Sequence, residues 1–307
     1  MTKLGAFSED SRLGGTLSPL QAFQALETAL GHPLALTRHY LSWDGDPSRG
    51  DIAWSIANGK TPIISWHPFI AGQKGGVGSG ACKWTDISNG SQDAIIVAFA
   101  QKLAALNHEV WFSFHHEPED DMAPVYAQAD SGTSASQFVL AWRHVRHIMR
   151  TIAPGGVPLV KFGVSLMGAT YRGGHGGPDV WMPPMRALDF IASDGYNRAG
   201  QCGSSSTWQT FDDVFGPAGQ YALLNKKPLL LQEVGCVEDL DAAGETKAQW
   251  LAVMEQRVQL WGNVIGVSYS DVYAAPGGVQ PYCNYHLDSS PESFAAFQAL
   301  QRSATFA

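Results

Sequence analysis

Two stretches decide the fold, VWFSFHHEPE at residues 110–119 and LLLQEVG at residues 229–235. In each, a mostly apolar run ends in polar or titratable side chains. Such continuous apolar runs are typical of strands that are buried on both faces, as in parallel sheets covered by helices. Both stretches therefore predict buried parallel strands with functional groups at their carboxyl ends.

Other short runs have the same apolar character. They lie at residues 4–7, 34–38, 62–66, 159–165, 190–193 and 264–268. Stretches with a helical period lie between the runs or after the last, at residues 19–30, 52–56, 94–106, 136–152, 212–224, 247–261 and 293–302. Ser18-Pro19 and Gly31 are typical start and stop signals for the first helix. Gly216-Pro217 is expected to break the helix at 212–224, because proline removes a backbone donor.

Strands that alternate with helices in this way predict an α/β protein with a closed (β/α)8 TIM barrel. No linker or low-complexity segment divides the chain, so we expect one domain over residues 1–307. The rival fold is a doubly wound open sheet, which usually has a glycine-rich phosphate loop after its first strand. Here the first strand runs into Ser8-Glu9-Asp10-Ser11 instead, which favours the barrel.

Composition excludes several classes of function. The 307 residues carry a formal net charge of −8, with 45% hydrophobic and 16% charged residues. Nucleic acids and acidic membrane surfaces require clustered Lys and Arg, and the sequence has no such run. The longest apolar run, residues 94–100, is far shorter than the roughly 20 residues of a membrane span. We therefore expect a globular monomer whose partner is neither nucleic acid nor a membrane.

The active site of such a barrel lies at the carboxyl ends of its strands. Glu117 and Glu233 each follow one of these strands, so both are expected to be partly desolvated. Burial and a second nearby carboxylate raise one carboxyl pKa and leave the other group ionised. Hydrolysis of glycosides with retention uses such a pair. The alternative is that each glutamate ends its strand by chance and pairs with an arginine.

The His-Glu pair at residues 116–117 and the Glu-Val-Gly at residues 233–235 resemble the clan A glycoside hydrolases. Within that clan, a histidine before the acid is similar to glycoside hydrolase family 26. That family holds β-mannanases, with some lichenases and β-1,3-xylanases. The resemblance implies a retaining endo-β-glycosidase that degrades a β-linked polysaccharide, with β-mannan as first choice and mixed-linkage β-glucan or β-xylan as alternatives.

The same resemblance implies roles for single residues. Glu117 would be the acid/base and Glu233 the nucleophile. His116 would hold the acid/base region, Tyr196 would donate to the nucleophile, and His67 would lie where the cleaved sugar sits. One departure concerns residues 118–121, where Pro-Glu-Asp-Asp replaces the Met-Asn-Gly and aromatic residue of family mannanases. This removes an expected sugar platform and adds three carboxylates.

Further side chains are expected at the strand ends or in loops on the active face, where aromatic rings can stack on sugars. These substrate-binding candidates are Arg38, Trp43, Trp66, His67, Tyr171, Trp181, Trp208 and Tyr269, with Trp84 as a further loop tryptophan. The alternative for the tryptophans is packing in the core.

A metal site at residues 115–119 is a weaker alternative. Adjacent residues at a strand end point to opposite faces, and no HExxH or CxxC spacing supports zinc. We therefore expect no metal and no cofactor. His144 and His147 lie three residues apart on a helix, where a solvated or capped face is the simpler interpretation. A non-catalytic carbohydrate-binding or phage-tail barrel remains the rival function, but binding alone requires neither an acid nor a nucleophile.

The four cysteines, Cys82, Cys202, Cys236 and Cys283, all follow predicted strands in loops. A bridge between Cys202 and Cys236, or between Cys236 and Cys283, is compatible with neighbouring loops around the barrel mouth. We expect at least one disulfide, and hence an oxidising compartment and an extracellular or secreted protein. The first residues have no apolar signal core, so either no classical signal is used or it is missing from this sequence. The alternative is four free thiols in a cytoplasmic enzyme.

Overall fold

The structure is a computed structural model that describes residues 1–9, 16–69, 82–119, 135–152, 157, 159–199, 201, 207–238, 246–274 and 283–306. Its main strands pair in chain order and close into a parallel barrel. They are β1 (Lys3–Ser8), β2 (Leu36–Leu41), β3 (Thr61–Trp66), β4 (Val110–Phe114), β5 (Val160–Met167), β6 (Phe190–Asn197), β7 (Leu229–Cys236) and β8 (Val264–Asp271). The predicted (β/α)8 fold class is confirmed.

Helices follow the strands in alternation. They are α1 (Pro19–Leu30), α2 (Gly50–Ala57), α3 (Trp84–Ser88), α4 (Asp93–Ala105), α5 (Ala135–Thr151), α6 (Gly168–Tyr171), α7 (Phe211–Leu224), α8 (Lys247–Trp261) and α9 (Pro291–Gln301). A short hairpin of β9 (Tyr273–Ala274) and β10 (Cys283–Asn284) was not expected from the sequence. The boundaries of α1 agree with its signals, because Ser18 caps the first turn and Gly31 ends the helix at a φ of 75°.

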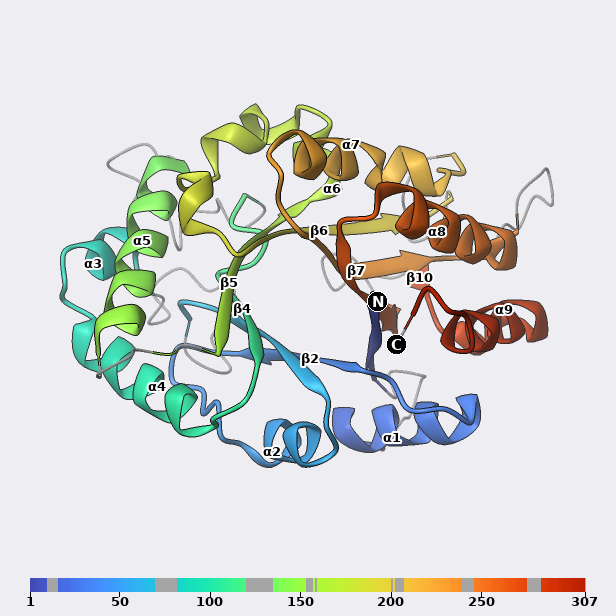
Figure 1. Ribbon diagram of the computed structural model, residues 1–307, viewed down its shortest axis with the longest axis horizontal. Helices are drawn as coiled ribbons and strands as arrows, with labels where there is room; N and C mark the ends of the chain where they lie inside the picture. The colour runs from blue at the N-terminus through green and yellow to red at the C-terminus, as the bar shows by residue number, and fades with distance from the viewer. Residues whose placement is uncertain are drawn as a thin grey trace. The chain divides into compact units, whose positions relative to one another are not determined.

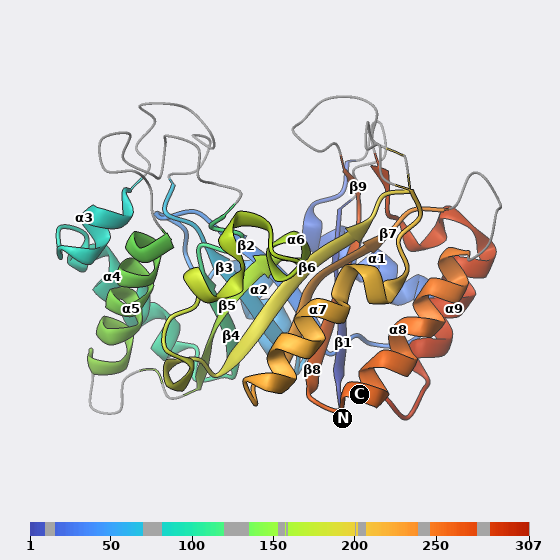
Figure 2. The same cartoon turned by 90° about the horizontal axis from the view of Figure 1, so that it is seen from above.

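The chain divides into two compact units, Met1–Arg38 with Ser193–Ala307, and His39–Ala192. In the first unit, β1 pairs in parallel with β8 along its whole length (Figure 2). Helices α8 and α9 of this unit lie side by side (Figure 1). The expectation of one domain over residues 1–307 stays a prediction.

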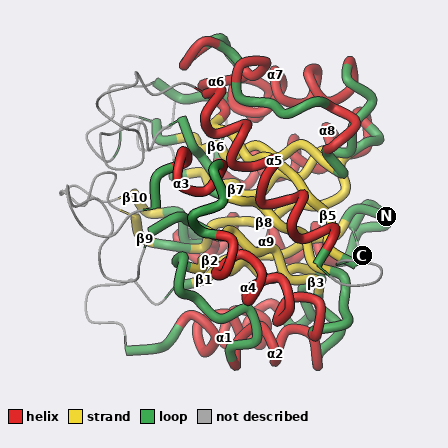
Figure 3. The backbone as a smooth tube through the Cα atoms, turned by 90° about the vertical axis from the view of Figure 1, so that its left-hand side faces the viewer, coloured by secondary structure: helices red, strands yellow, loops and turns green. Residues whose placement is uncertain are grey.

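The unit of residues 39–192 has a core of stacked aromatic rings. The Trp66 indole lies 4.0 Å from Trp43 and 4.0 Å from Phe99, measured between ring centroids, at interplanar angles of 13° in both cases. Helices α4 and α5 lie on the outside of this unit's strands (Figure 3). Offset stacking of this kind contributes about 0.5–1.5 kcal/mol per pair beyond the area buried.

Helix α7 corrects one prediction, because it continues through Gly216-Pro217 from Phe211 to Leu224. Proline costs a helix one hydrogen bond, which tertiary packing can offset. Phe215 and Ala218, on either side of the proline, are both fully buried. Gly219 lies so close to Trp261 that an added Cβ would come within 2.9 Å of the indole. The buried face of α7 therefore holds the helix together across Pro217.

The cysteines support only part of the disulfide prediction. Cys283 is disulfide-bonded, so the expectation of at least one bridge is confirmed. Cys236 and Cys82 are free thiols, so both specific pairs proposed from the sequence are wrong, since each contained Cys236. Cys236 lies inside β7 rather than in a loop, and its thiol donates to the carbonyl of Val237. Cys202 lies outside the described residues.

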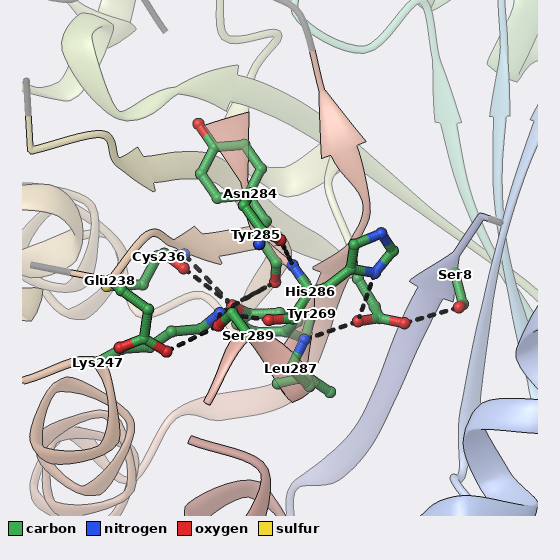
Figure 4. Close-up of polar contacts among 11 residues, drawn as sticks. Ser8, Cys236, Glu238, Lys247, Tyr269, Asn284, Tyr285, His286, Leu287 and Ser289 are labelled. Carbon is green, nitrogen blue, oxygen red and sulfur yellow. Dashed lines mark hydrogen bonds and ion pairs between the residues drawn. The ribbon is translucent and has the colours of Figure 1, made fainter. Parts of the chain in front are cut away.

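Lys247, the first residue of α8, is completely buried. Its ammonium donates to the carbonyls of Tyr285 (3.3 Å) and His286 (2.6 Å) and to Oγ of Ser289 (2.9 Å), as Figure 4 shows. Burial lowers the pKa of Lys247 to about 8, although the nearby Cys236 and Glu238 favour the charged form. The lysine thus ties the start of α8 to the segment that precedes α9.

This lysine predicts a pH dependence of stability. Between its folded pKa of about 8 and its unfolded value near 10.5, the unfolded chain binds more protons, so this group raises stability as the pH rises. We expect the difference in unfolding free energy between wild type and Lys247→Met to grow by about 2 kcal/mol from pH 7.5 to 9.5. Urea titrations at several pH values measure it. A flat difference would mean that the lysine keeps its solution pKa in the fold.

The helices that the structure describes include none with the length and apolar character needed to cross a membrane.

Candidate active site

Glu233 lies inside β7, a strand that is buried along its whole length. Glu233 as a whole is 7% exposed. Nη2 of Arg38 lies 3.3 Å from Oε1, and the hydroxyl of Tyr196 donates to Oε2 at 2.6 Å. Both carboxylate oxygens therefore have a partner. A cation and a hydroxyl donor stabilise the ionised form and orient it, as a nucleophilic carboxylate requires.

The structure explains why the Glu-Val-Gly stretch ends in a glycine, Gly235. A Cβ at this position would come within 2.4 Å of the Tyr196 ring. Only the lack of a side chain lets Tyr196 lie against β7 and reach Glu233 two residues earlier. The glycine therefore supports the hydrogen bond between Tyr196 and Glu233.

Ser270 is a site residue that the sequence analysis missed. Its Oγ lies 3.1 Å from the hydroxyl of Tyr196, which already donates to Glu233. The predicted strand ended at residue 268, whereas β8 continues to Asp271. Alternation along this longer strand puts Ser270 and Tyr269 on opposite faces, and that periodicity is the signal that could have found Ser270.

Tyr269, a predicted substrate-binding residue, is fully buried in the structure. Its hydroxyl donates to the carbonyl of Tyr285 at 2.9 Å, and its ring packs against Phe297 of α9. Burial raises the pKa of Tyr269 well above its ordinary value. The ring thus holds α9 and the preceding segment against β8, and it offers no face to a sugar.

Replacing Tyr196 by phenylalanine tests the orientation of Glu233. A hydrogen bond to a charged group is worth about 1.5–3 kcal/mol, so we expect kcat to fall about tenfold to a hundredfold with the fold unchanged. Turnover of a polysaccharide measures kcat, and a melting curve measures the stability of the fold. Tyr221→Phe on α7 is the matched control and should keep full activity. A fall in melting temperature with unchanged kcat would reduce Tyr196 to a packing role.

Glu117 lies three residues beyond the end of β4, in a turn rather than at the strand end itself. Its amide donates to the carbonyl of Ser165 on β5 at 3.0 Å. Both Glu117 (φ 50°) and His115 (φ 48°) have left-handed backbones, which cost energy for residues with a side chain and concentrate at functional sites. The Glu117 side chain is 23% exposed, so it is available to a ligand.

Two histidines flank Glu117 within the unit of residues 39–192. Nδ1 of His116 lies 2.9 Å from Nε2 of His67, and Nε2 of His116 lies 3.9 Å from the Glu117 carboxylate. The ring of Tyr40 contacts both imidazoles, with its centroid 5.5 Å from that of His116. The structure thus brings Glu117, His116 and His67 together as the sequence predicted, and it adds Tyr40.

His115 forms a different hydrogen bond. Its Nδ1 accepts a hydrogen bond of 2.8 Å from the Trp84 indole, and the residue is fully buried. Its ring centroid lies 5.8 Å from that of His67, whereas His116 forms a close polar contact with His67. His144 is paired with Asp93 at 2.7 Å, which gives it a structural partner on a neighbouring helix.

Most of the predicted sugar-stacking tryptophans lie in the core. Trp43, Trp66, Trp84 and Trp181 are each at most 2% exposed. They pack against other rings, and the Trp181 indole donates to the carbonyl of His175 at 3.0 Å. Their faces are covered, so the core-packing alternative describes them. Sequence position did not reveal this burial, because Trp66 belongs to β3 itself and Trp84 begins α3, so neither lies in a loop.

The remaining substrate-binding candidates differ in how exposed they are. Trp208 is half-buried in the segment before α7. Tyr171 is 8% exposed and donates to the carbonyl of Ala192 at 2.8 Å. The Arg38 side chain is fully buried against Glu233, so it contacts the carboxylate and has no surface for sugar. Of these three residues, Trp208 is the most exposed.

Glu119 corrects another interpretation. It was expected to add a carboxylate next to the acid, but it is 1% exposed. Its Oε1 accepts hydrogen bonds from the amide of Met167 (2.6 Å) and the hydroxyl of Thr170 (2.8 Å). Glu119 therefore joins the segment after β4 to the start of α6. Asp120 and Asp121 lie outside the described residues.

No protein-family model matches the chain. Endoglucanase H of Acetivibrio thermocellus is 27% identical over 308 aligned residues, which cover 96% of this chain and 31% of that protein. The chain thus spans about a third of the length of this relative.

Solved structures are similar over the whole chain. The catalytic domain of the GH26 endo-β-1,4-mannanase of Bacillus sp. JAMB-750 has a TM-score of 0.63 at 15% identity, covering 100% of this chain and 87% of that chain. A GH26 β-mannanase of Bacteroides ovatus has a TM-score of 0.61 at 14% identity, covering 100% of this chain and 90% of that chain.

The closed order of the strands and these solved structures confirm the predicted (β/α)8 barrel. Within this fold, the solved structures named here are assigned to glycoside hydrolase family 26. The resemblance to that family is therefore confirmed for the fold.

Proposed function

We propose that the protein is a retaining endo-β-glycosidase in which Glu233 is the nucleophile and Glu117 the acid/base. The observation that carries the proposal is the state of Glu233, a buried carboxylate with Arg38 on one oxygen and Tyr196 on the other. A carboxylate that is held ionised and oriented at the end of a barrel strand is what nucleophilic attack on an anomeric carbon requires.

The proposed mechanism has two displacements. Glu233 attacks the anomeric carbon while Glu117 protonates the leaving oxygen, giving a glycosyl-enzyme and a shortened chain. Glu117 then takes a proton from water, which attacks the same carbon and releases the sugar with retained configuration. His116 is proposed to position the Glu117 carboxylate, since its Nε2 lies 3.9 Å away. The mechanism requires no cofactor.

The substrate is proposed to be a β-linked polysaccharide, cleaved internally. β-Mannan is the first candidate, because the similar solved structures are titled mannanases. β-Glucan is the second, because the relative with the higher sequence identity is named an endoglucanase. The disulfide at Cys283 supports an oxidising compartment and hence secretion, and we expect the protein to act as a monomer.

A screen for reducing sugars tests the proposal. Purified protein is incubated with mannan, mixed-linkage β-glucan and β-xylan, and products are followed with time. We expect oligosaccharides of several lengths to appear early from one of these polymers. Early release of monosaccharide alone would show an exo-enzyme instead. Tight binding of a polymer with no cleavage of any would favour the non-catalytic barrel.

A further inference from the structure

A second candidate site lies beside the first and last barrel strands, and Glu233 is not among its lining residues. A groove of about 270 Å³ starts at Ser8, the last residue of β1, and Asp271, the last residue of β8. These two residues are register partners in the parallel pair. One wall of the groove is apolar and comes from Ala22, Ala25, Leu26 and Ala29 of α1 and Phe294 of α9.

The polar end of the groove contains a pair of Asp271 and His286. Figure 4 shows His286, Leu287 and Ser8 with their polar contacts as dashed lines. Ser8 donates to Oδ2 of Asp271 at 2.8 Å, the amide of Leu287 donates to Oδ1 at 2.8 Å, and Nδ1 of His286 lies 3.3 Å from Oδ1. Burial opposes ionisation of Asp271, but hydrogen bonds from His286, Leu287 and Ser8 more than offset it and lower its pKa. In the neutral imidazole, an ionised Asp271 favours the tautomer with its proton on Nδ1, which leaves a lone pair on Nε2.

That Nε2 is buried, and among the described residues it has no hydrogen-bond partner. His286 as a whole is 5% exposed. A buried acceptor that is left unpaired costs about 1–3 kcal/mol. Glu9 lines the same groove, and burial raises its pKa. The unpaired Nε2 and the Glu9 carboxylate on one groove indicate a ligand that supplies donors to both.

The lining restricts the ligand. No lysine or arginine is among the described residues of the groove, so a phosphate or carboxylate ligand would lack a counter-charge. The ligand must offer two donors at one end and an apolar face for the α1 wall. A pyranose ring has both, since its hydroxyls donate and its C–H groups pack on apolar side chains. A free ammonium or a divalent cation satisfies the acceptors but leaves the apolar wall without a partner.

We propose that this groove binds a neutral saccharide unit, with one hydroxyl donating to Nε2 of His286 and another to the Glu9 carboxylate. The choice of a saccharide rests on the proposed function, whereas the unpaired Nε2 of His286 does not. Such a site holds a polysaccharide at the edge of the barrel without taking part in its cleavage.

The test is a titration of the Glu233→Ala protein with mannotetraose and cellotetraose, followed by two-dimensional amide NMR. The amides of Leu287 and Ala25 report on the groove, and those of Gly235 and Tyr196 report on the candidate active site. We expect saturable shifts at Leu287 and Ala25. His286→Asn keeps a donor for Asp271 but removes Nε2, and it should weaken groove binding about threefold to tenfold.

Three further variants test groove binding without changing the hydrogen bonds of Asp271. Glu9→Ala should weaken groove binding by a similar factor, while Glu292→Ala, an exposed carboxylate in the first turn of α9, should leave it unchanged. Ala25→Leu fills the groove from the wall and should remove the shifts at Leu287. Calcium and butylammonium are titrated as competing ligands.

Groove amides that stay unshifted, or shifts that survive both His286→Asn and Glu9→Ala, would overturn the proposal. So would shifts produced by calcium or butylammonium but not by either saccharide. Cleavage of polysaccharide by the wild type without groove shifts would leave the proposed function intact and refute the groove. Groove shifts without cleavage of any polymer would support the groove and refute the proposed function.

Discussion

Replacing Glu233 by alanine is expected to abolish turnover of every glycan and every aryl glycoside. Without a nucleophile no glycosyl-enzyme forms. The anomeric carbon must be attacked whatever the acidity of the leaving group. The alanine also leaves the buried Arg38 guanidinium without its carboxylate partner. We expect kcat to fall by on the order of ten-thousandfold, toward the upper end of what one catalytic group contributes.

The measurement is release of reducing sugar and of a phenol from an activated aryl glycoside, at equal concentrations of folded protein. Glu255→Ala is the matched control, since Glu255 accepts a hydrogen bond from Thr305 on the outside of the same unit. It should keep full activity. Glu233→Ala protein that kept its activity would rule out the two-carboxylate mechanism itself.

Replacing Glu117 by alanine should instead give a selective defect. A natural sugar leaving group needs a proton, so its cleavage should slow about a hundredfold to ten-thousandfold. A very acidic phenol needs little protonation, so the first step on its glycoside should survive. The second step still needs a base for water, and glycosyl-enzyme should accumulate. A burst of phenol followed by a slow steady state measures this.

Azide separates the two roles of Glu117 further. It attacks without a general base, so it should restore turnover of the activated substrate by Glu117→Ala and yield a β-glycosyl azide. Glu109→Ala, at the opposite end of β4 from Glu117, is the control. It should turn over both substrate classes at the wild-type rate, and azide should not change that rate. If Glu117→Ala lost activity equally on both substrates and azide had no effect, Glu117 would not be the acid/base.

Much of the fold was predictable because local signals and periodicity agree. The apolar run of β4 has the bounds expected from the sequence, and so has α8 at Lys247–Trp261. Helix α1 was framed by Ser18 and Gly31, whose capping chemistry is local. Helix α7 was not predictable across Pro217, because burial of Phe215 and Ala218 against other elements offsets a local penalty.

The candidate site was predictable in its residue types but not in all of its contacts. Glu233 and Tyr196 lie in one hydrogen-bonded group, as expected. Arg38 was expected to touch sugar, yet it contacts Glu233 from β2, a pairing between residues 195 positions apart. Glu119 was expected only to add a carboxylate after the acid, but it is buried and accepts hydrogen bonds from Met167 and Thr170. Such pairings depend on which strands are neighbours.

The sequence by itself determined the alternation of strands and helices and the polar residues that follow the strands. Both depend on interactions between residues close in the chain, namely side-chain periodicity, capping and proline geometry. Only the tertiary structure decided which aromatic rings are covered, as with Trp66 between Trp43 and Phe99. Burial is a property of contacts between distant segments, and the same tryptophan after a strand can stack on a sugar or on another ring.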